Sequence, residues 1–490
     1  MSPRGCVRRG AGGPVSPRGS VRRGAGGPMS PRGCVHPGVA SVVSWVVTTD
    51  SRGASTALLT DRYELTMLTA ALRSGAAGRR GVFEVFARAL PNGRRYGVVA
   101  GTGRLLDALE RFHFGPGELA FLRDNQMVDD DALRYLESYH FGGDIWGYGE
   151  GDAYFPGSPI LVVEAPFAEA VVLETLVLAI LNHDSAIASA ASRMVTAADG
   201  RPLIEMGSRR THEMAAVASA RAAYIAGFGS TSNLQAGRDY GVPTSGTSAH
   251  AFSLIHDSER DAFAAQLAAL GKGTTLLVDT FDVARAVRTA VELAGPGLGA
   301  VRIDSGDLPM VARQVRDLLD ELGARATRIV LSGDLNEYSI AALAAAPVDG
   351  YGVGTSLVTG SGAPTAALVY KLVARATEAN GEGALQPVAK RSVGKPGRGG
   401  RKWAARQFDE NGVAAAELIT RADAFGQDLG GIPNRPLLHQ LVRSGEIVGR
   451  EPLTAARDRH RAALAELPVH ALQLSRGYPA IPTVFAPDGE

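Results

Sequence analysis

Cysteine is almost absent from the chain. Its 490 residues include only two cysteines, Cys6 and Cys34, and residues 35–490 contain none. A chain of this kind has no disulfide framework, no cysteine nucleophile and no cysteine metal site in its main part. These three classes of protein are therefore excluded for residues 35–490.

Long apolar runs, a strong net charge and the common catalytic signatures are also missing. The longest apolar stretch, residues 171–181, is interrupted by Glu174, so it predicts a buried helix and not a membrane span. The net charge of +1 gives no general indication of nucleic-acid binding. The chain has no G-x-x-x-x-G-K-[ST], H-E-x-x-H or G-x-S-x-G motif, so any nucleotide is held in another way.

The first part of the chain is a repeat with a period of 14 residues. Residues 2–14 recur as residues 16–28, and a third copy begins at Ser30. The segment is rich in glycine and proline and poor in large apolar residues, so we predict that residues 1–53 are a disordered leader. Its arginines suit a transit peptide, but the amphipathic spacing is missing, as is the apolar stretch of a secretory signal. We interpret the leader as repetitive upstream sequence translated from a start codon assigned too early.

The leader distorts the charge balance of the chain. Seven of the 51 basic residues and none of the 50 acidic ones lie in residues 1–49, which leaves a net charge of −6 on the rest. Apolar residues make up 45% of the chain, enough for large buried cores, and the length suits roughly two to three domains. We therefore expect a mildly acidic, cytoplasmic protein.

Residues 54–165 have the pattern of an α+β domain. Residues 60–72 carry leucines on one helical face, and Thr60 or Asp61 is placed to cap the first turn. Residues 82–90 alternate like a half-buried strand. Further helices and strands are expected at residues 102–112, 130–139, 145–150 and 160–164.

Residues 166–375 change to short apolar strands that end in polar residues or glycine, with helical spacing between them. This rhythm is typical of βα units, so we predict an irregular TIM-like α/β barrel with its site at the carboxyl ends of the strands. Residues 376–490 are expected to form a basic loop and a C-terminal segment that returns to the N-terminal domain. The seven expected strand segments are residues 202–210, 224–233, 244–250, 276–282, 301–307, 329–336 and 350–356.

Carboxylates and glycines follow the later strands. Asp304 and Asp307 follow one strand and Asp334 follows the next. Mg²⁺ that carries a diphosphate needs one or two such ligands, so Asp304 and Asp334 are candidate magnesium ligands. Helix capping is the alternative, chiefly for Asp307. The small residues of segment 350–356 expose backbone N–H groups to a phosphate, unless the segment is an ordinary tight turn.

His250 is the candidate nucleophile. It follows Gly-Thr-Ser-Ala at a predicted strand end, and Asp279 is placed to orient its ring so that the other nitrogen becomes a better nucleophile. A structural histidine is the alternative. Arg209 and Arg302 are cations expected at the same face.

In this order, the motifs resemble those of the nicotinate phosphoribosyltransferase family of NAD salvage. The resemblance spans about residues 57–485 and leaves the leader outside. Each motif alone is modest, and the ordered set is specific. The motifs are Thr60–Met67, Gly207–Arg210, Thr231–Asn233, Gly246–His250, Arg302–Asp307, Ser332–Asp334 and Gly352–Thr355.

The resemblance implies an enzyme that joins nicotinate to phosphoribosyl pyrophosphate with Mg²⁺, gives nicotinate mononucleotide and pyrophosphate, and couples this to ATP hydrolysis. It implies that His250 is transiently phosphorylated. It also implies that Tyr63 stacks on the pyridine from the neighbouring subunit of a homodimer with shared active sites. The other implied contacts are Arg209, Arg302, Thr231, Ser232 and Asn233 with substrate, Asp304 and Asp334 with ribose and magnesium diphosphate, and Gly352, Gly354 and Thr355 with the 5′-phosphate.

The nearest alternative is nicotinamide phosphoribosyltransferase. Those relatives place an acidic residue near the loop that corresponds to residues 231–233, whereas this chain has Ser232 and Asn233 there. A carboxylate beside the substrate would repel nicotinate, so its absence favours the acid. Quinolinate phosphoribosyltransferases are shorter and lack the motif that ends in His250. An inactive nucleotide-sensing relative would have lost His250 or the aspartates. Nucleic-acid binding through the leader is a last alternative, and we expect neither nucleic acid nor a membrane as partner.

Overall fold

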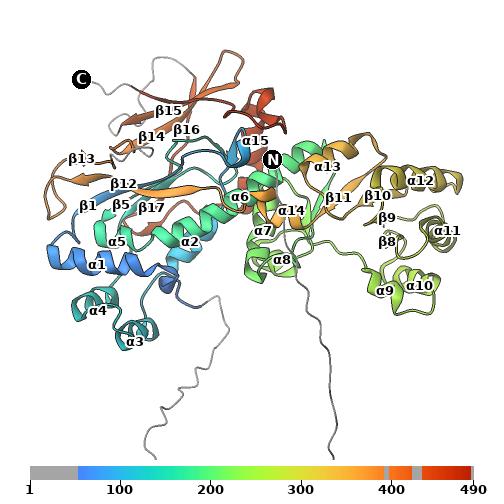
Figure 1. Cartoon of the computed structure of the whole chain (residues 1–490), viewed down its shortest axis with the longest axis horizontal. Helices are drawn as coiled ribbons and strands as arrows, with labels where there is room; N and C mark the ends of the chain where they lie inside the picture. Colours follow the sequence, from blue (N-terminus) through green and yellow to red (C-terminus); the bar gives the residue numbers. More distant parts are fainter. Residues whose placement is uncertain (1–52, 391–396, 422–432, 487–490) are drawn as a thin grey trace, which may run out of the picture. The chain divides into compact units, whose positions relative to one another are not determined.

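Two large sheets of different kinds organise the chain (Figure 1). The computed structural model describes residues 53–390, 397–421 and 433–486, which belong to one compact unit. The prediction for the leader concerns residues that, apart from Gly53, lie outside these ranges. One sheet is antiparallel and combines segments from both ends of the described chain, and the other is parallel.

The antiparallel sheet has seven strands in the order β13-β12-β1-β5-β3-β17-β18. Phe83 of β1 stacks on Tyr370 of β12 with ring centroids 4.8 Å apart, which anchors the two strands to each other. The sequence prediction placed residues 368–375 in the barrel, but they belong to this sheet because β12 pairs with β1 from Gly81 to Ala87. The strands are β1 (Arg80–Ala87), β3 (Asp144–Gly147), β5 (Leu161–Pro166), β12 (Leu368–Ala376), β13 (Leu385–Pro387), β17 (His439–Arg443) and β18 (Glu446–Ile447).

Helices of the N-terminal segment pack on this sheet and on one another. Helix α1 (Arg62–Ser74) begins where the leucine spacing predicts. Its cap differs from the prediction, since the side chain of Asp61 accepts no capping hydrogen bond and the hydroxyl of Thr60 donates to the carboxylate of Glu64. The other helices here are α2 (Thr102–Glu110), α3 (Pro116–Asp124), α4 (Asp130–Glu137) and α5 (Phe167–Val171).

The second sheet has six parallel strands in the order β7-β6-β11-β10-β9-β8. It curls as an open half barrel, because its edge strands β7 and β8 do not pair with each other in the described part of the chain. The predicted fold class, an irregular α/β barrel combined with an α+β domain, is confirmed in this open form. The strands are β6 (Leu203–Glu205), β7 (Ser230–Thr231), β8 (Thr275–Leu277), β9 (Ala300–Ile303), β10 (Arg328–Leu331) and β11 (Gly350–Val353).

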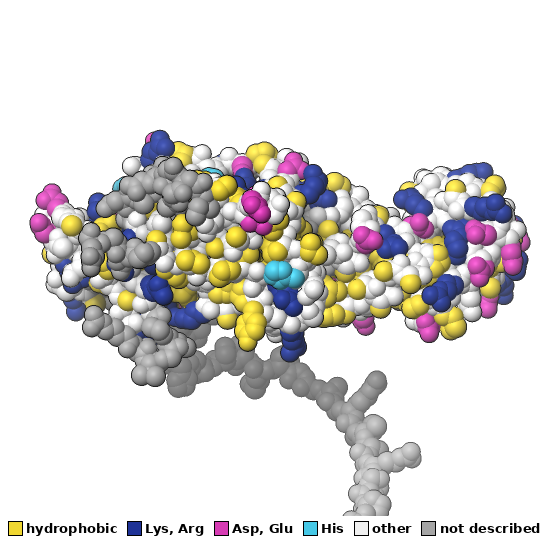
Figure 2. All heavy atoms as spheres, turned by 90° about the horizontal axis from the view of Figure 1, so that it is seen from above, with side chains coloured by type: hydrophobic (Ala, Val, Ile, Leu, Met, Phe, Trp, Pro, Cys, Tyr) yellow, Lys and Arg dark blue, Asp and Glu magenta, His cyan; other side chains and the backbone are white. Residues whose placement is uncertain are grey.

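Helices alternate with these strands. In α12, Ala312, Val315, Leu318 and Leu319 are buried. Its five charged residues are Arg313, Arg316, Asp317, Asp320 and Glu321. Figure 2 shows basic and acidic side chains interspersed over the end of the described chain that carries α11 and α12, so no single sign of charge dominates this face. The helices are α7 (Glu213–Ile225), α8 (Leu234–Tyr240), α9 (His250–Leu254), α10 (Glu259–Leu270), α11 (Val283–Ala294), α12 (Leu308–Glu321), α13 (Glu337–Ala342) and α14 (Thr355–Val358).

Two of the seven expected strand segments were wrong in detail. Tyr224 and Ile225 are the last residues of α7, and the strand that follows is only two residues long. Residues 244–250 form no strand, and Thr244 makes a single parallel bridge to Thr231. Short apolar runs suit a helix and a strand equally well, and here the packing of α7 on α6 decides for the helix.

Helix α6 (Glu174–Ala198) packs on β12 of the antiparallel sheet and on α7, α13 and α14, which accompany the parallel sheet. Buried serines connect it to the strand before α2, since the N–H groups of Val98 and Ala100 donate to Ser189 Oγ at 2.9 Å and Ser185 Oγ at 3.1 Å. No helix of the described residues is both long enough and apolar enough to span a membrane. A two-stranded sheet and five short 3-10 helices complete this part of the fold: β2 (Gly97–Val98) and β4 (Ala153–Tyr154), with η1 (Ala57–Leu59), η2 (Pro91–Gly93), η3 (Leu343–Ala345), η4 (Gly360–Gly362) and η5 (Val469–Leu472).

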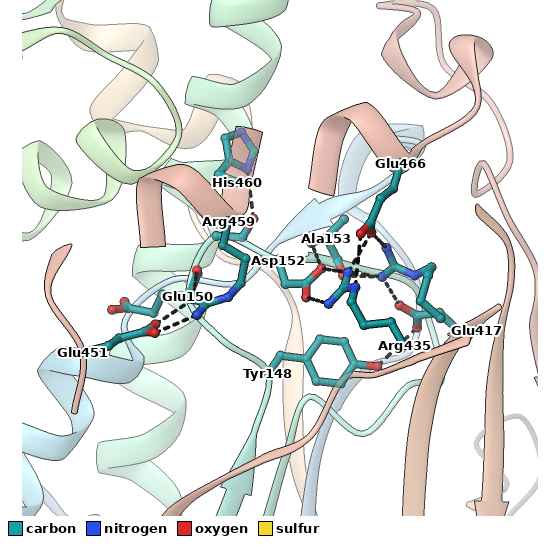
Figure 3. A network of polar contacts seen from close by, with 12 residues as sticks. Tyr148, Glu150, Asp152, Ala153, Glu417, Arg435, Glu451, Arg459, His460 and Glu466 are labelled. Atoms are coloured by element: carbon teal, nitrogen blue, oxygen red, sulfur yellow. Dashed lines mark hydrogen bonds and ion pairs between the residues drawn. The ribbon is translucent and has the colours of Figure 1, made fainter. Parts of the chain in front are cut away.

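A buried network of charges ties the C-terminal segment to the rest of the protein. Figure 3 shows Arg435 between Asp152 and Glu466, with its guanidinium nitrogens 2.7 Å from an oxygen of each. Nearby, the fully buried Arg406 donates to Glu417 Oε1 at 2.6 Å. Burial raises the pKa of Glu417 to about 7 although Arg406 lies beside it. This segment contains β14 (Lys402–Phe408), β15 (Ala414–Arg421), β16 (Asn434–Pro436), β19 (Thr483–Phe485) and α15 (Leu453–Glu466).

Candidate functional site

The carboxyl ends of the parallel strands carry nearly all of the candidate residues. In a parallel sheet these ends lie along one edge, where the following loops meet. The structure places every sequence-predicted site residue on or next to these loops except Tyr63. The residues are Arg209 after β6, Thr231, Ser232 and Asn233 at β7, His250 before α9, Asp279 after β8, Arg302 and Asp304 at β9, Asp334 after β10, and Gly352, Gly354 and Thr355 at β11.

Two carboxylates form a linked pair at this edge. Asp279 Oδ2 accepts the backbone N–H of Asp304 at 2.8 Å and the hydroxyl of Ser305 at 2.7 Å. Asp304 Oδ1 in turn accepts the hydroxyl of Ser332 at 2.5 Å. Asp279 Oδ1 is buried and has no hydrogen-bond partner within the described ranges. An acceptor oxygen without a donor is suited to a further ligand.

Asp334 lies on the next loop, and its side chain is exposed. The turn before it depends on Gly333, which has a φ of +122°. A Cβ at that position would lie 2.9 Å from the backbone oxygen of Asp304. Only glycine tolerates both this φ and this close approach. Gly333 therefore allows the two loops that carry Asp304 and Asp334 to lie side by side.

His250 is the first residue of α9 and is half-buried. Its Nδ1 lies 3.2 Å from the hydroxyl oxygen of Thr280. The sequence suggested that Asp279 orients the ring of His250. In the structure, the partner of Nδ1 is instead Thr280, the residue directly after Asp279. Asp279 is turned toward the β9 loop by the hydrogen bonds described above.

Arg302 presents a partly buried guanidinium. One terminal nitrogen donates to the hydroxyl of Thr247, and Nε is buried with no partner among the residues that the structure describes. Burial lowers the pKa of Arg302. The carboxylates of Asp304 and Asp279 raise this pKa, and the positive charge of Arg209 lowers it. The two arginines are therefore near enough to repel each other, which is an arrangement suited to an anionic ligand.

The glycines of β11 allow close packing at the last strand end. A Cβ on Gly352 would lie 2.7 Å from Met206 Sδ and 3.2 Å from Ser332 Cβ. After Gly354, α14 begins, and its first main-chain donation runs from Leu357 N–H to Gly354 C=O at 3.1 Å. The N–H groups that come before Leu357 in this turn have no acceptor within the helix, as at any helix start.

Tyr63 lies apart from the other candidates. It is in the first turn of α1, and its side chain is 46% exposed. Burial of the hydroxyl, together with Glu174 and Glu64, raises its pKa to about 12. None of these neighbours belongs to the parallel sheet.

The residues present fit a metal that arrives with a phosphate better than a metal held by protein alone. Within residues 53–390, 397–421 and 433–486, no group of three or more histidine, cysteine or carboxylate side chains is arranged to hold a metal ion. Asp304 and Asp334 occupy neighbouring loops, and Asp279 contributes an acceptor oxygen without a partner. A Mg²⁺ ion bound through one or two carboxylates and substrate phosphates needs no more protein ligands than this.

Sequence reasoning did not single out four polar residues that complete the site. Arg302 donates to the hydroxyl of Thr247, and Nδ1 of His250 is engaged by the hydroxyl of Thr280. The hydroxyl of Ser332 donates to Asp304. Glu205 ends β6 and is fully buried. A glutamate at the end of an otherwise apolar strand is the one signal that could have indicated it, because an unpaired buried carboxylate is costly.

Comparison with known proteins identifies relatives over most of the chain. Residues 58–182 match the family model described as nicotinate phosphoribosyltransferase (NAPRTase) N-terminal domain. The nicotinate phosphoribosyltransferase pncB1 of Mycobacterium tuberculosis is 58% identical over 438 residues, which cover 88% of this chain and 95% of that protein. The crystal structure of human nicotinic acid phosphoribosyltransferase is similar with a TM-score of 0.74 and 25% identity, over 87% of this chain and 97% of that chain. A nicotinate-nucleotide pyrophosphorylase from Pyrococcus furiosus shares the fold, with a TM-score of 0.69 and 23% identity over 84% of this chain and 95% of that chain.

Proposed function

The chain belongs to the nicotinate phosphoribosyltransferase family, and from this we propose that it joins nicotinate to phosphoribosyl pyrophosphate, giving nicotinate mononucleotide and pyrophosphate. The proposal includes coupling to ATP hydrolysis through a phosphohistidine at His250 and a homodimer with shared sites. The observation that carries it is the 58% identity over 95% of a relative with this name. The gathering of the candidate residues at one edge of the parallel sheet supports it.

The arginines serve the anionic groups of the substrates. Nicotinate and phosphoribosyl pyrophosphate are both negatively charged, and Arg302 and Arg209 lie near each other with donors to spare. The loop of Ser232 and Asn233 brings no acidic side chain beside the pyridine. Positive charge together with a loop that has no acidic side chain favours nicotinate over nicotinamide.

Bond formation needs placement more than proton transfer. The pyridine nitrogen attacks C1′ with its lone pair as diphosphate leaves, so no base has to remove a proton. C1′ becomes oxocarbenium-like, and the protein contributes by holding the two partners in line. Asp304, fixed by Ser332 and by the backbone bond to Asp279, is the residue that we assign to the ribose.

Asp304 and Asp334 would hold Mg²⁺ together with the diphosphate, and the ion supplies charge stabilisation to the leaving group when bound. The residues of β11 and the following turn, Gly352, Gly354 and Thr355, are assigned to the 5′-phosphate. Of these, Gly354 and Thr355 offer backbone N–H donors at the start of α14, and Gly352 lies in β11 just before them.

His250 is assigned to the ATP step. With Nδ1 engaged by Thr280, the lone pair of Nε2 attacks the γ-phosphorus of ATP, and the bond to ADP breaks with its electron pair on ADP. Water later hydrolyses the P–N bond and returns the neutral ring. The phosphorylated ring adds negative charge beside the carboxylates and so changes how substrates and diphosphate bind.

The dimer is proposed from the position of Tyr63. Its ring lies away from the parallel sheet of its own chain, next to the exposed Leu58 and Leu59 in sequence. The loops around the site carry exposed apolar side chains of their own, including Leu254 and Ile255, the latter 81% exposed. Apolar surface on both elements supports an interface that brings Tyr63 to the site of a second copy.

Product analysis tests the proposal. The protein is mixed with phosphoribosyl pyrophosphate, Mg²⁺ and ATP, and with either nicotinate or nicotinamide, and the products are separated by chromatography. We expect nicotinate mononucleotide, pyrophosphate and ADP in the first mixture and at most a trace of mononucleotide in the second. Turnover of nicotinamide in preference to nicotinate would overturn the substrate assignment.

A further inference from the structure

We propose that Glu205 is a positioning residue that fixes the two substrate loops after β6 and β7 relative to each other. This inference rests on the proposed function, because the substrate that the loops hold is taken from it. Glu205 ends β6, and its side chain is fully buried beneath both loops. It touches neither substrate as assigned above, so it acts through the loops.

The side chain of Glu205 is part of a closed ring of hydrogen bonds. Oε1 accepts the backbone N–H of Gly207 at 2.5 Å, and Oε2 accepts the hydroxyl of Thr231. Thr231 Oγ1 in turn accepts the backbone N–H of Asn233 at 2.9 Å. The Asn233 side chain then crosses to the first loop, where Nδ2 donates to Ser208 Oγ at 3.0 Å. Ser208 follows Gly207 in the chain, which closes the ring.

Main-chain bonds support the same junction. The N–H of Ser232 donates to the backbone oxygen of Glu205 at 2.8 Å. Asn233 Oδ1 accepts Ala236 N–H at 2.9 Å and so caps α8. Thr231 also exchanges bonds with the segment that leads to His250, since Ser245 N–H donates to its oxygen at 2.9 Å. One buried carboxylate therefore joins two loops directly and a third through Thr231.

The direction of the hydrogen bonds makes Glu205 hard to replace. Both oxygens of its carboxylate accept hydrogen bonds, Oε1 from Gly207 N–H and Oε2 from the hydroxyl of Thr231, which itself accepts the N–H of Asn233. Burial raises the pKa of Glu205, and the two donors lower it. No cation is among the groups that shift it. A glutamine has the same shape but presents an NH₂ group to one of the two donors, so it breaks the chain of donation.

Of the substrate contacts proposed above, the ring carries Arg209 and the loop beside the pyridine, and we assign both of these to nicotinate. Arg209 follows Ser208, and Ser232 lies between Thr231 and Asn233. If the ring opens, Arg209 and the pyridine loop can shift relative to each other while the β11 and β9 ends stay in place. A displacement of about 1 Å at a reacting group is enough to cost about a hundredfold in rate. The defect should therefore fall on nicotinate and spare phosphoribosyl pyrophosphate.

The test compares four variants in steady-state kinetics with both substrates varied. Glu205→Gln and Thr231→Val should each lower kcat/KM for nicotinate by about tenfold to a hundredfold and change KM for phosphoribosyl pyrophosphate by less than about threefold. The double variant should lose little more than the worse single one, because both open the same ring. Thr231→Ser keeps the hydroxyl and should recover most of the activity that Thr231→Val loses. Glu417→Gln is the matched control: an equally buried glutamate away from the site, whose loss should leave nicotinate kinetics unchanged.

Two outcomes would overturn the inference: unchanged nicotinate kinetics in Glu205→Gln, or losses that multiply in the double variant and fall equally on both substrates. Hydrogen exchange supplies a readout that does not depend on turnover. Thr231→Val should speed exchange of the Asn233 amide about tenfold or more, and Thr231→Ser should not. If the unaltered chain shows no activity with nicotinate, the proposed function fails, and the exchange result alone decides whether the ring exists.

Discussion

Nδ1 of His250 lies 3.2 Å from the hydroxyl oxygen of Thr280, across the gap between the start of α9 and the end of β8. The hydroxyl is both a donor and an acceptor, so it can accept from the N–H of a neutral ring. That leaves the lone pair on Nε2, which a nucleophile requires. Thr280 therefore orients the ring of His250, a role that the sequence assigned to the carboxylate of Asp279.

Replacing His250 separates the ATP step from phosphoribosyl transfer. His250→Ala should abolish ATP hydrolysis and the acid-labile labelling of the protein by γ-labelled ATP. Transfer without ATP should remain measurable at raised substrate concentration, because the pyridine nitrogen needs no base. His256→Ala is the control, since His256 follows α9 and its Nδ1 is engaged by the backbone oxygen of Phe252 at 2.7 Å. Full labelling of His250→Ala would contradict the assignment.

Replacing Thr280 tests the orientation of the ring. Thr280→Val removes the hydroxyl and keeps the shape, and it should slow labelling of His250 by about twofold to tenfold, as expected for one lost hydrogen bond. Thr280→Ser should restore most of the rate. The measurement is the time course of labelling in single-turnover experiments. Equal rates in all three chains would show that Nδ1 needs no partner.

A carboxylate in the pyridine loop should reverse the substrate preference. Ser232 is exposed at the site edge, between the buried Thr231 and the half-buried Asn233. Ser232→Asp should lower kcat/KM for nicotinate by about tenfold or more, through charge repulsion of about 1.4 kcal/mol or more. Ser232→Asn, which adds similar bulk without charge, should lose much less. We expect nicotinamide turnover to rise relative to nicotinate in the aspartate variant only; an equal loss in both variants would point to steric effects.

Complementation tests the shared site. Tyr63→Ala and Asp304→Ala should each be inactive alone. After subunit exchange, a mixture of the two should regain up to about a quarter of the activity, because half of the dimers of a twofold-symmetric assembly are mixed and each has one intact site of two. The exchange itself is followed by native mass spectrometry. A mixture that stays inactive although mixed dimers form would show that Tyr63 acts within its own chain.

The buried network makes stability depend on pH near neutrality. The pKa of Glu417 is raised from 4.5 to about 7 in the folded state. A raised carboxyl pKa stabilises the folded state at low pH, and this stabilisation is lost as pH rises through 7. The free energy of unfolding should therefore fall by up to about 3 kcal/mol between pH 4.5 and 7.5, relative to Glu417→Gln, which cannot titrate.

Urea unfolding at a series of pH values measures this difference. His460 acts in the opposite direction, because burial lowers its pKa to about 4. Its contribution to the free energy of unfolding is therefore lost as pH falls below 6.5. Both chains contain His460, and its effect cancels in the difference between them. Parallel curves for the two chains would contradict the role of Glu417.

The general placement of the site was predictable, because parallel strands bring their carboxyl ends to one edge. Asp304 and Asp334 needed only this rule to be assigned to neighbouring loops. The partners of the site residues were not predictable. Thr280 takes the place expected of Asp279 because the β9 loop uses that carboxylate for its own backbone, a fact of loop conformation that no spacing reveals.

Pairing between distant segments was equally hidden. Residues 368–375 continue an apolar pattern, and only tertiary packing on Phe83 assigns them to the antiparallel sheet. Tyr224 and Ile225 look like a strand and end a helix, since a three-residue apolar run carries no period of its own. Helix α3 was not predicted, because Pro116–Asp124 buries only two leucines.

Because β12 pairs with β1, the antiparallel sheet cannot be completed until late in the synthesis of the protein. Ala87 is paired with Leu368, and at about 5–20 residues per second the ribosome needs roughly 15 to 55 seconds to pass from one to the other. During that interval one edge of β1 has no strand to pair with and is open to association with other nascent chains. The parallel sheet lies wholly between these two strands in sequence, so it emerges while the antiparallel sheet is still incomplete. A chaperone that shields strand edges would therefore act on β1 first, long before the residues that form the site are in place.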